Sequence, residues 1–551
     1  MKPTSRTAAA AALAVTAEPQ VPLDDRFSSI DRLAPWPEQA SLRRRLLAAV
    51  PASVVCALVG TPLRQALAHS DERSAAPNAF TRLFPQLPPF APSSPPLVAA
   101  LMDIGRPGGL MDANDALSAG PIALITDPSL SINNPNAALP AGTAGSTFLG
   151  QFVDHDVTFD ASSHLGLATA PQQVSNMRRP ALDLDSVYGR GPVADPHLYE
   201  PQDPARLRLE SGGAFEDLPR LASGRALIAD PRNDEHVILA GLHAAVMLFH
   251  NHVVERVRAA GEVAPEHVFA SARRSVTWHY HWIVLHELLP SFVGHALVDN
   301  ILRHGARIGR ERAQRQLSMP VEFSGAAYRF GHSLVRPSYR ANLKGHRGGP
   351  FFGFVFDPRA QGQADPDDLR GGQRASRRFV GWQTFFDFGD GELKPRKRID
   401  TQLSTPLFRL PLGSIADGST PTSLAQRNLL RHLTWQLPSG QRIAHHLGLP
   451  ALRPGDLADL AGYGLDLERN TPLWFYVLRE AQLATGGQTL GPVGGRIVAE
   501  VLIQLMQDDA DSWLHAKPHW RPTLPSRHGA GQFDMVDLLT LAGVSPTHRG
   551  Q

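Results

Sequence analysis

Apolar residues repeated at helical spacing are the feature that most constrains the fold of this chain. They predict long helices over residues 235–260 and over residues 268–289, the second ending at Pro290. Shorter patterns predict helices over residues 148–159, 427–435, 457–463 and 493–506. Strand signals are few, and residues 351–356 carry the clearest one. The sequence therefore predicts a mainly helical fold with few short strands and long irregular loops.

The length of 551 residues exceeds that of one ordinary domain, and a proline-rich stretch over residues 85–96 divides the chain. Such a stretch is extended and semi-rigid, and it serves as a linker or a surface strap. We expect an N-terminal extension over residues 1–97, one large domain over residues 98–520 and a C-terminal tail over residues 521–551.

The N-terminus leaves the destination of the protein open. Lys2 and Arg6 precede a weakly apolar, alanine-rich stretch over residues 7–17 that has the order of a short export signal. An export signal, with a secreted or periplasmic destination, and a disordered tail both fit this stretch. No run of about 18 apolar residues occurs in the chain, so we expect no transmembrane segment.

Composition excludes several classes of function. Lys and Arg together number 54 and Asp and Glu 52, a net charge of +2, so no basic surface for nucleic acid is expected. The single cysteine, Cys56, lies in an apolar run and is expected to be an inert buried thiol. One cysteine excludes an internal disulfide, a Cys-x-x-Cys metal or redox site and the attachment of a c-type haem. Any catalysis must therefore rely on histidines, carboxylates, arginines or a cofactor.

Polar residues converge on one side of the helix predicted over residues 148–159. Gln151, Asp154 and His155 are three and four positions apart and share a face, whereas Asp156 points elsewhere. Polar groups among apolar residues are costly to bury unless a partner or a ligand satisfies them. A ligand-binding face and a plain surface turn are both compatible with this stretch alone.

The order Gly-Gln-Phe-Val-Asp-His-Asp over residues 150–156 resembles the distal haem segment of the animal-type haem peroxidases, the peroxidase-cyclooxygenase superfamily. Further segments follow in the order of the family up to about residue 505, in a form similar to bacterial members. The resemblance implies a large all-helical haem peroxidase domain with haem b as its cofactor. It also implies hydrogen peroxide and small-molecule reductants as substrates, turned over through compound I, and it leaves the oligomeric state unassigned.

The resemblance assigns two segments to the distal side of the haem. His155 would be the catalytic base and Arg232 the catalytic arginine, with Gln151 beside them. Heterolysis of a peroxide O–O bond needs a base that moves a proton from the near oxygen to the far one and a fixed positive donor. Asp154 and Glu235 would attach the haem through two ester links. On its own, an Arg-x-x-Glu pattern at a helix start is more typical of capping and an ion pair.

Two further stretches resemble the proximal side of the haem. Residues 327–335 would make His332 the axial ligand of the haem iron, and residues 425–431 would support it. A metal-bound imidazole usually donates its other N–H to an acceptor, and Asn428 stands at that position. Arg431 would face a haem propionate. Without the resemblance, a lone histidine in such a stretch is more typical of a core residue.

A loop over residues 177–189 resembles the calcium loop of the family. Calcium takes about six to eight oxygen ligands. The resemblance supplies the carboxylates of Asp156, Asp183 and Asp185 and the backbone carbonyls of Arg179 and Ala181. Arg179 departs from the pattern, because the family usually has a threonine there whose hydroxyl is also a ligand. Without the resemblance, the two loop carboxylates would be interpreted as a solvated turn.

Two positions favour a peroxidase over an oxygenase within the superfamily. The fatty-acid oxygenases carry a radical-forming tyrosine three residues before the proximal histidine, where this chain has Arg329, with Tyr328 one step earlier. Asp154 and Glu235 are both carboxylates, which the covalent-haem peroxidases of the family require and the cyclooxygenases lack. Where one member forms an additional sulfonium link through methionine, this chain has His236. We therefore expect ester links without a sulfonium, and easier oxidation of phenols, iodide, bromide or thiocyanate than of chloride. A fatty-acid dioxygenase or hydroperoxide-processing enzyme and a non-catalytic haem- or calcium-binding protein remain the alternatives.

Two other motifs indicate no chemistry of their own. His286 and Glu287 begin like the helix of a zinc protease, but Pro290 replaces the second histidine. The glycine-rich residues 491–495 follow no strand and precede no Lys-Ser or Lys-Thr pair, so nucleotide binding is not expected there.

Overall fold

A computed structural model describes residues 79–130, 142–308, 317–345, 348–360, 363, 365–415 and 418–551. They belong to one compact unit that extends from Gln65 to Gln551. Cys56 and the stretch with the order of an export signal lie outside the described residues, so both interpretations stay predictions.

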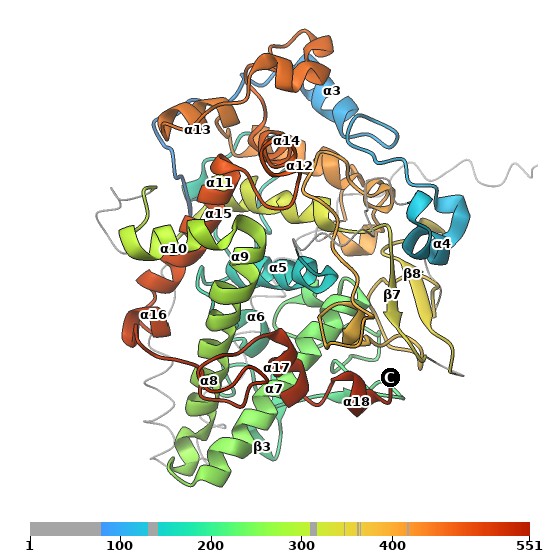
Figure 1. The fold of residues 1–551 in the computed structure, drawn as a ribbon, viewed down its shortest axis with the longest axis vertical. Coiled ribbons are helices and arrows are strands. Elements are labelled where there is room, and N and C mark those ends of the chain that lie inside the picture. The colour runs from blue at the N-terminus through green and yellow to red at the C-terminus, as the bar shows by residue number, and fades with distance from the viewer. Residues whose placement is uncertain are drawn as a thin grey trace, which may run out of the picture. The chain divides into compact units, whose positions relative to one another are not determined.

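The described part of the chain is mainly helical, which confirms the predicted fold class (Figure 1). Its α-helices are α3 (Pro95–Ile104), α4 (Gly120–Thr126), α5 (Ala144–Val157), α6 (Asp185–Tyr188), α7 (Val237–Ala260), α8 (Val268–Ile283), α9 (Leu289–Val293), α10 (His295–His304), α11 (Val321–Ser324), α12 (Leu424–Thr434), α13 (Gly440–His446), α14 (Leu473–Thr485), α15 (Pro492–Asp508), α16 (Trp513–Ala516), α17 (Met535–Leu541) and α18 (Pro546–Arg549). The 3₁₀ helices include η6 (Pro231–Asp234), η9 (Ala327–Leu334) and η15 (Pro454–Tyr463).

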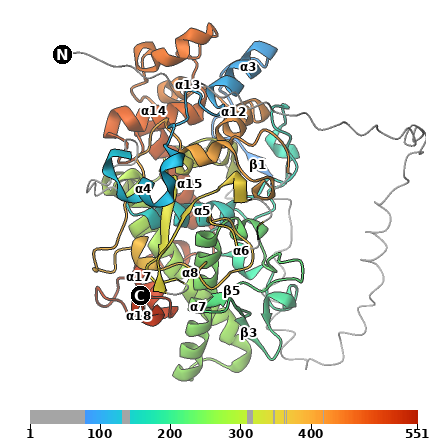
Figure 2. The ribbon, with the colours of Figure 1, turned by 90° about the vertical axis from the view of Figure 1, so that its right-hand side faces the viewer.

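The strands are short and pair two by two. They are β1 (Phe80–Thr81), β2 (Tyr199–Glu200), β3 (Asp203–Leu207), β4 (Glu210–Ser211), β5 (Glu216–Asp217), β6 (Met319–Pro320), β7 (Ser338–Asn342) and β8 (Phe351–Phe354). β1 pairs with β6 in parallel, and the pairs β2 with β3, β4 with β5 and β7 with β8 are antiparallel. The β7–β8 pair lies beside α4 (Figure 2), and β8 corresponds to the strand predicted over residues 351–356.

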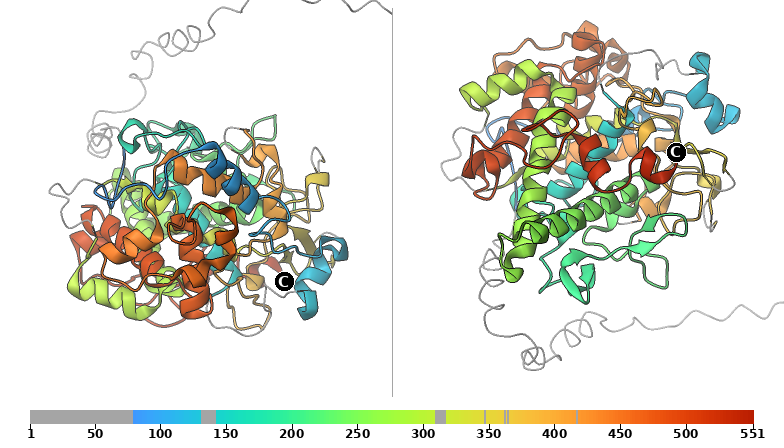
Figure 3. Two further views of the ribbon diagram at one scale, coloured as in Figure 1. Left: turned by 90° about the horizontal axis from the view of Figure 1, so that it is seen from above. Right: turned by 60° about the horizontal axis from the view of Figure 1, so that its bottom comes forward.

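Buried helices position the candidate site. α5 begins at Thr143, whose side chain accepts the backbone N–H of Ser146 at 3.1 Å, and it packs against α7. α8 runs beside α7, as the right-hand view of Figure 3 shows. Among the described residues, α7 is the one helix that is long and apolar enough to cross a membrane. Because 89% of its most apolar stretch is buried, α7 has the character of a core helix.

The helical path predicted over residues 268–289 does not end at Pro290. α8 passes through a π-helical turn, η8 (Val284–Leu288), into α9, which contains Pro290 and ends at Gly294 with a φ of 81°. Proline is tolerated in the first turn of a helix, where its missing N–H would have no partner within the helix. The π-helical turn makes Pro290 the second residue of a new helix, so the path continues. Residues 457–463, predicted as an α-helix, belong to the 3₁₀ helix η15.

The hydrophobic core extends beyond the boundaries expected at residues 97 and 520. Phe80, Phe84 and Phe90 are buried, although they precede α3. The proline-rich stretch is therefore packed against the domain rather than free of it. At the other end, Leu538 and Leu539 of α17 are buried, and α17 packs on α7.

Candidate active site

One deep cavity lies among α5, η6, η9 and α12. Its volume is about 260 Å³, close to the lower end of the roughly 300–1,000 Å³ of ordinary small-molecule sites. The polar side chains that line it include Gln151, Asp154, His155, Arg232, Glu235, His236, Tyr328, Arg329, His332, Arg427 and Arg431. The structure thus brings the predicted catalytic and haem-contacting residues to one cavity, apart from Asn428, which lies behind His332.

His155 and Arg232 are held together in the cavity wall. Arg232 donates two hydrogen bonds to Asp230, from Nε (3.0 Å) and Nη2 (2.7 Å), and one from Nη2 to the carbonyl oxygen of His155 (3.0 Å). Its guanidinium lies 4.3 Å from the ring centroid of Phe159. Burial opposes ionisation of Asp230, but Arg232 outweighs it and lowers the pKa of Asp230 to about 2. Burial, assisted by the charge of Arg232, lowers the pKa of His155 to about 3, so this imidazole is neutral and can accept a proton.

Gln151 joins α5 to the residues that follow Arg232. Its Nε2 donates to Oε2 of Glu235 at 3.1 Å, and its Oε1 lies 2.9 Å from Nε2 of His236. Nδ1 of His236 accepts the backbone N–H of Leu239 at 3.2 Å, so the ring proton of a neutral His236 lies on Nε2. His236 therefore donates to the amide oxygen of Gln151 and leaves the amide nitrogen to face Glu235.

Two carboxyl groups in the cavity wall are poorly solvated. Burial raises the pKa of Glu235 to about 8, although Arg232 opposes the change. Burial also raises the pKa of Asp154, against the charges of Arg329 and Arg232. Glu235 therefore favours its neutral form at pH 7 in the absence of a bound group.

His332 enters the cavity from η9 with Asn428 of α12 behind it. Nδ1 of His332 lies 2.7 Å from Nδ2 of Asn428, and Nη1 of Arg329 donates to Oδ1 of Asn428 at 3.2 Å. Because an arginine can only donate, the amide oxygen faces Arg329 and the amide nitrogen faces His332. We expected the imidazole to donate a hydrogen bond to the amide oxygen of Asn428, but the amide nitrogen faces the imidazole instead. Burial, then the charge of Arg329, lowers the pKa of His332 to about 3, which leaves a neutral ring.

Two arginines from α12 bring positive charge to the cavity wall. Nη1 of Arg431 lies 3.3 Å from Oδ2 of Asp160. Arg427, one turn earlier, donates from Nη1 to the carbonyl oxygen of Ser419 at 2.9 Å. Guanidinium groups in such a wall suit carboxylates, which accept charge-assisted hydrogen bonds from them.

Part of the chain is similar to known proteins. Residues 159–351 match the family model described as animal haem peroxidase. Over 112 residues, the chain is 32% identical to heme peroxidase 2 of Caenorhabditis elegans, which covers 19% of this chain and 16% of the length of that protein. Residues 159–351 are therefore similar to the animal haem peroxidases.

One solved structure shares the fold of this chain. Peroxidase A from Dictyostelium discoideum matches with a TM-score of 0.58 and 15% identity, over 84% of this chain and 92% of that one. At this identity the likeness shows the fold alone. A fatty acid alpha-dioxygenase from Oryza sativa matches with a TM-score of 0.48 and 13% identity, over 85% of this chain and 87% of that one, which is too low to support an argument about function.

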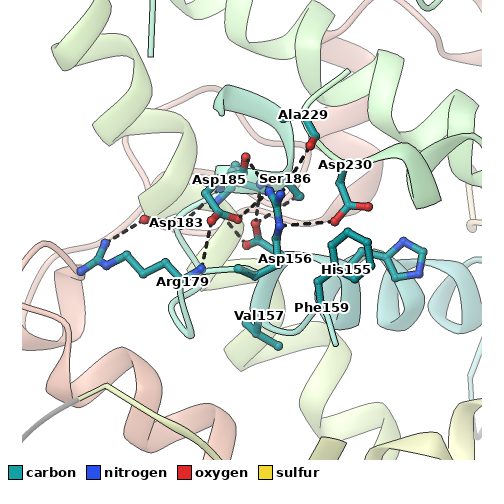
Figure 4. Close-up of polar contacts among 12 residues, drawn as sticks. His155, Asp156, Val157, Phe159, Arg179, Asp183, Asp185, Ser186, Ala229 and Asp230 are labelled. Carbon is teal, nitrogen blue, oxygen red and sulfur yellow. Dashed lines mark hydrogen bonds and ion pairs between the residues drawn. The ribbon is translucent and has the colours of Figure 1, made fainter. Parts of the chain in front are cut away.

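Three carboxylates lie together beside α5, and Figure 4 shows them with His155. One oxygen each from Asp156, Asp183 and Asp185 lies within 4.8 Å of the others. Burial and the mutual repulsion of these groups raise the pKa of Asp156 well above its ordinary value and that of Asp185 to about 7. A set of oxygen donors that repel one another is the chemistry that calcium accepts, so the donors fit this ion.

Arg179 acts on this acidic cluster through its side chain and its backbone. Its guanidinium lies 2.7 Å from Asp183 and 2.7 Å from Asp509. Its carbonyl, an expected calcium ligand, accepts the N–H of Ala181 at 2.7 Å, and its own N–H donates to Asp185 at 3.0 Å. The arginine therefore neutralises part of the charge that would attract a cation, which a threonine at this position would not do.

Arg178 connects the acidic cluster to the cavity, a link that the sequence did not reveal. Its Nη1 donates to Oδ1 of Asp185 at 3.4 Å, and its Nε lies 3.5 Å from Oδ2 of Asp230. Asp230 is also the residue that holds Arg232. The charges of the cluster and of the cavity are thus joined through two buried ion pairs.

Sequence reasoning missed two residues that shape the turn carrying Arg232. Asn233 is fully buried, and its Oδ1 lies 2.9 Å from Nδ1 of His155. At Gly371, a Cβ would lie 1.5 Å from the carbonyl oxygen of Asp234, so only glycine lets the chain pass so close to this turn. The position of Asn233 directly after Arg232 is a local signal for its contact with His155. Nothing in the sequence marks the close approach of Gly371 to Asp234.

Proposed function

We propose that this protein is a haem peroxidase that reduces hydrogen peroxide and oxidises small reductants such as phenols, iodide, bromide or thiocyanate. One observation carries the proposal: a neutral imidazole, His155, lies beside the fixed guanidinium of Arg232 in a cavity that a second neutral imidazole, His332, also lines. A base and a positive donor are the two groups that cleavage of a peroxide bond requires. A second imidazole suits the axial coordination of iron.

The residues of the cavity fit a haem group. His332 would bind the iron through Nε2, which requires the ring proton to lie on Nδ1. The amide of Asn428, whose nitrogen lies 2.7 Å from Nδ1, would then have to turn its oxygen to the ring and away from Arg329. Arg431 would pair with a propionate, in exchange for or in addition to its contact with Asp160. Haem b, when bound, supplies an iron that removes two electrons from reductants after reaction with peroxide.

The residues of the distal wall would then act on the peroxide itself. His155 would take the proton from the peroxide oxygen nearer the iron and return it to the farther oxygen, so that water leaves. Arg232 would stabilise the negative charge that develops on the departing oxygen. Asp230 keeps Arg232 from moving during this step because it holds two of its nitrogen atoms. Gln151 would orient a water or a small reductant between His155 and Glu235.

Asp154 and Glu235 would attach the haem through ester links. Burial raises the pKa of both carboxyl groups. An ester removes the cost of burying a carboxylate, because it carries no charge. His236 donates to Gln151, which in turn donates to Glu235. His236 occupies the position where a sulfonium link would need a methionine.

A fatty-acid dioxygenase is the second candidate, because Tyr328 does line the cavity. Its hydroxyl donates to the carbonyl oxygen of Gly150 at 3.2 Å, and its ring stacks on Phe323 with centroids 4.6 Å apart. Burial raises the pKa of Tyr328 well above its ordinary value. A phenol that is engaged in this way is poorly disposed to take a hydrogen atom from a lipid, which favours the peroxidase.

The proposal is tested by the absorbance spectrum of haem-supplemented protein before and after stoichiometric hydrogen peroxide. We expect the Soret band to change on adding peroxide and to return when a phenol is oxidised, and we expect acidified organic solvent to leave the haem on the protein. Oxygen uptake with an unsaturated fatty acid, without phenol oxidation, would identify the dioxygenase instead. A Soret band that ignores peroxide would indicate a non-catalytic haem-binding protein, and freely extracted haem would disprove the ester links.

We also propose that calcium binds the acidic cluster of Asp156, Asp183 and Asp185. Calcium should raise the melting temperature and a chelator should lower it, since a ligand at about 100 times its Kd stabilises by about 2.7 kcal/mol. Arg179→Thr should bind calcium roughly fivefold more tightly, because a positive charge about 4 Å away costs on the order of 1 kcal/mol even in a water-like medium. Asp183→Asn is the matched control and should respond to calcium less than the wild type. Equal melting temperatures in calcium and chelator, with no calcium in elemental analysis, would contradict the proposal.

A further inference from the structure

Asn233 contacts His155 without reaching the cavity. It lies in the 3₁₀ helix η6 directly after Arg232, and its side chain is fully buried. Its backbone N–H donates to the carbonyl oxygen of Asp230 at 3.1 Å, which fixes its position in the turn. It does not line the cavity, so any effect it has on chemistry must pass through the imidazole that it touches.

The contact decides which nitrogen of His155 is available. Nδ1 of His155 lies 2.9 Å from Oδ1 of Asn233, which leaves Nε2 as the nitrogen free to face the cavity. An amide oxygen can only accept a hydrogen bond, so Nδ1 carries the ring proton when Oδ1 faces it. Nε2 then has a free lone pair and is the basic atom. With the amide reversed, Nδ1 would accept and Nε2 would carry the proton, which would make the ring useless as a base.

A second histidine contacts the other end of the amide. Nδ2 of Asn233 lies 3.0 Å from Nδ1 of His243 on α7. An amide NH₂ can only donate, so it pairs with Nδ1 of His243 when that ring carries its proton on Nε2. Burial lowers the pKa of His243 to about 4, so the ring stays neutral and can accept. His155, Asn233 and His243 form one continuous hydrogen-bonded relay from α5 to α7.

The charges around His155 do not fix its tautomer. Arg232 and Asp230 belong to the turn of η6 and offset each other in a bidentate ion pair. His236, at the start of α7, is neutral because burial lowers its pKa to about 3. The carboxylate of Asp156 follows on α5 and faces the acidic cluster. Among the partners of the His155 ring, the side chain of Asn233 is the one that distinguishes its two nitrogen atoms.

We propose that Asn233 is a positioning residue that holds His155 in the tautomer with a basic Nε2, and that His243 stabilises this arrangement by accepting a hydrogen bond from the amide of Asn233. The inference rests on the proposed role of His155 as the base toward peroxide. It assigns to His243 of α7 an indirect role in the reaction, which is to support the residue that fixes the tautomer of His155.

Variants of Asn233 separate the tautomer from the packing. Asn233→Leu keeps the volume and removes the acceptor, so the rate constant for reaction with peroxide should fall by about 10². Asn233→Asp restores an acceptor toward Nδ1, so the rate should stay within tenfold of wild type at alkaline pH. The rate falls at low pH because His155 becomes protonated. The negative charge of the new aspartate should raise the midpoint of this fall by about 1–3 pH units. A role in packing alone would produce neither the recovery nor the shift.

Variants of α7 test the second half of the relay. His243→Phe removes the acceptor of the amide, and we expect a loss in the same direction as that of Asn233→Leu but smaller. His250→Phe is the matched control, because His250 is also a buried histidine of α7 but pairs with Tyr188 at 3.0 Å. We expect the peroxide reaction of His250→Phe to equal that of the wild type.

Cyanide binding gives a readout that does not depend on turnover. Hydrogen cyanide must give up its proton when it binds haem iron, so the equilibrium affinity should fall by about tenfold or more in Asn233→Leu, which corresponds to 1.4 kcal/mol. It should recover in Asn233→Asp. If Asn233→Leu does not fold, the pH shift of Asn233→Asp and the comparison of His243→Phe with His250→Phe still decide the matter.

The inference and the proposed function fail in different ways. If His155→Ala loses its reaction with peroxide while Asn233→Leu keeps the wild-type rate, pH profile and cyanide affinity, the relay is wrong and the peroxidase proposal stands. If His155→Ala also reacts like the wild type, the proposed base is wrong and the relay falls with it.

Discussion

Replacing His155 by alanine should lower the rate constant for the reaction of the haem-loaded protein with hydrogen peroxide by about 10²–10⁴. The expectation follows from the neutral, buried imidazole in the cavity wall, whose pKa burial lowers to about 3. Such a ring accepts a proton without first losing one, over the whole physiological range. The measurement is stopped-flow absorbance of the Soret band at increasing peroxide concentration.

The loss at His155 should be specific to that imidazole. His445→Ala removes an exposed histidine of α13 and should leave the rate unchanged. Arg232→Lys keeps a positive charge but cannot reproduce the two hydrogen bonds to Asp230 and the one to the carbonyl of His155. A rate within about tenfold of wild type in His155→Ala would remove this residue from the mechanism.

The distal face was predictable because it depends on local geometry. Helical spacing alone places Gln151, Asp154 and His155 on one side of α5 and sends Asp156 to the other, and the structure has them in the cavity and in the acidic cluster respectively. The type of fold followed from the same periodicity. These predictions needed no knowledge of how distant segments meet.

What the sequence did not predict depends on contacts between distant segments. The pair of Arg329 and Asn428 spans 99 positions, and it turns the amide of Asn428 in the direction opposite to the one expected from metal sites in general. The close approach of Gly371 to the turn of Arg232 is of the same kind. The extent of the core was also hidden, because Phe80 precedes, and Phe90 lies within, a proline-rich stretch that indicates a linker or a surface strap, and both rings are buried.

Helix continuity through Pro290 shows a subtler limit. Proline ends a helix in most contexts because it lacks an N–H and clashes with the preceding turn. Here the π-helical turn η8 inserts an extra residue, so Pro290 falls in the first turn of α9. Such turns are rare and have no marked sequence pattern. A rule that is right for an isolated helix therefore gave the wrong end point.

Replacing His332 by alanine should remove the axial ligand and shift the Soret band. For haem that is not yet ester-linked, the affinity is expected to fall by about 10² or more, since loss of an outer partner alone typically costs about 10–100-fold. The space left behind is bounded by Asn428 on one side and by Gly331, around which a Cβ would meet no atom within 4 Å. Imidazole added to His332→Ala should therefore enter the gap and restore the Soret band. Asn428→Leu is the matched control, because it leaves the ligand in place.

The variants His332→Ala and Asn428→Leu together test whether His332 is the ligand of the haem iron. Asn428→Leu should retain haem, yet its Soret band should respond differently to ligands, because the imidazole loses the contact at Nδ1 and Arg329 loses its acceptor. An unaltered Soret band in His332→Ala would show that iron is held by another residue. His155 also lines the cavity and influences the pKa of His332, so the double variant His155→Ala and His332→Ala would then lose the Soret band that the single variant keeps.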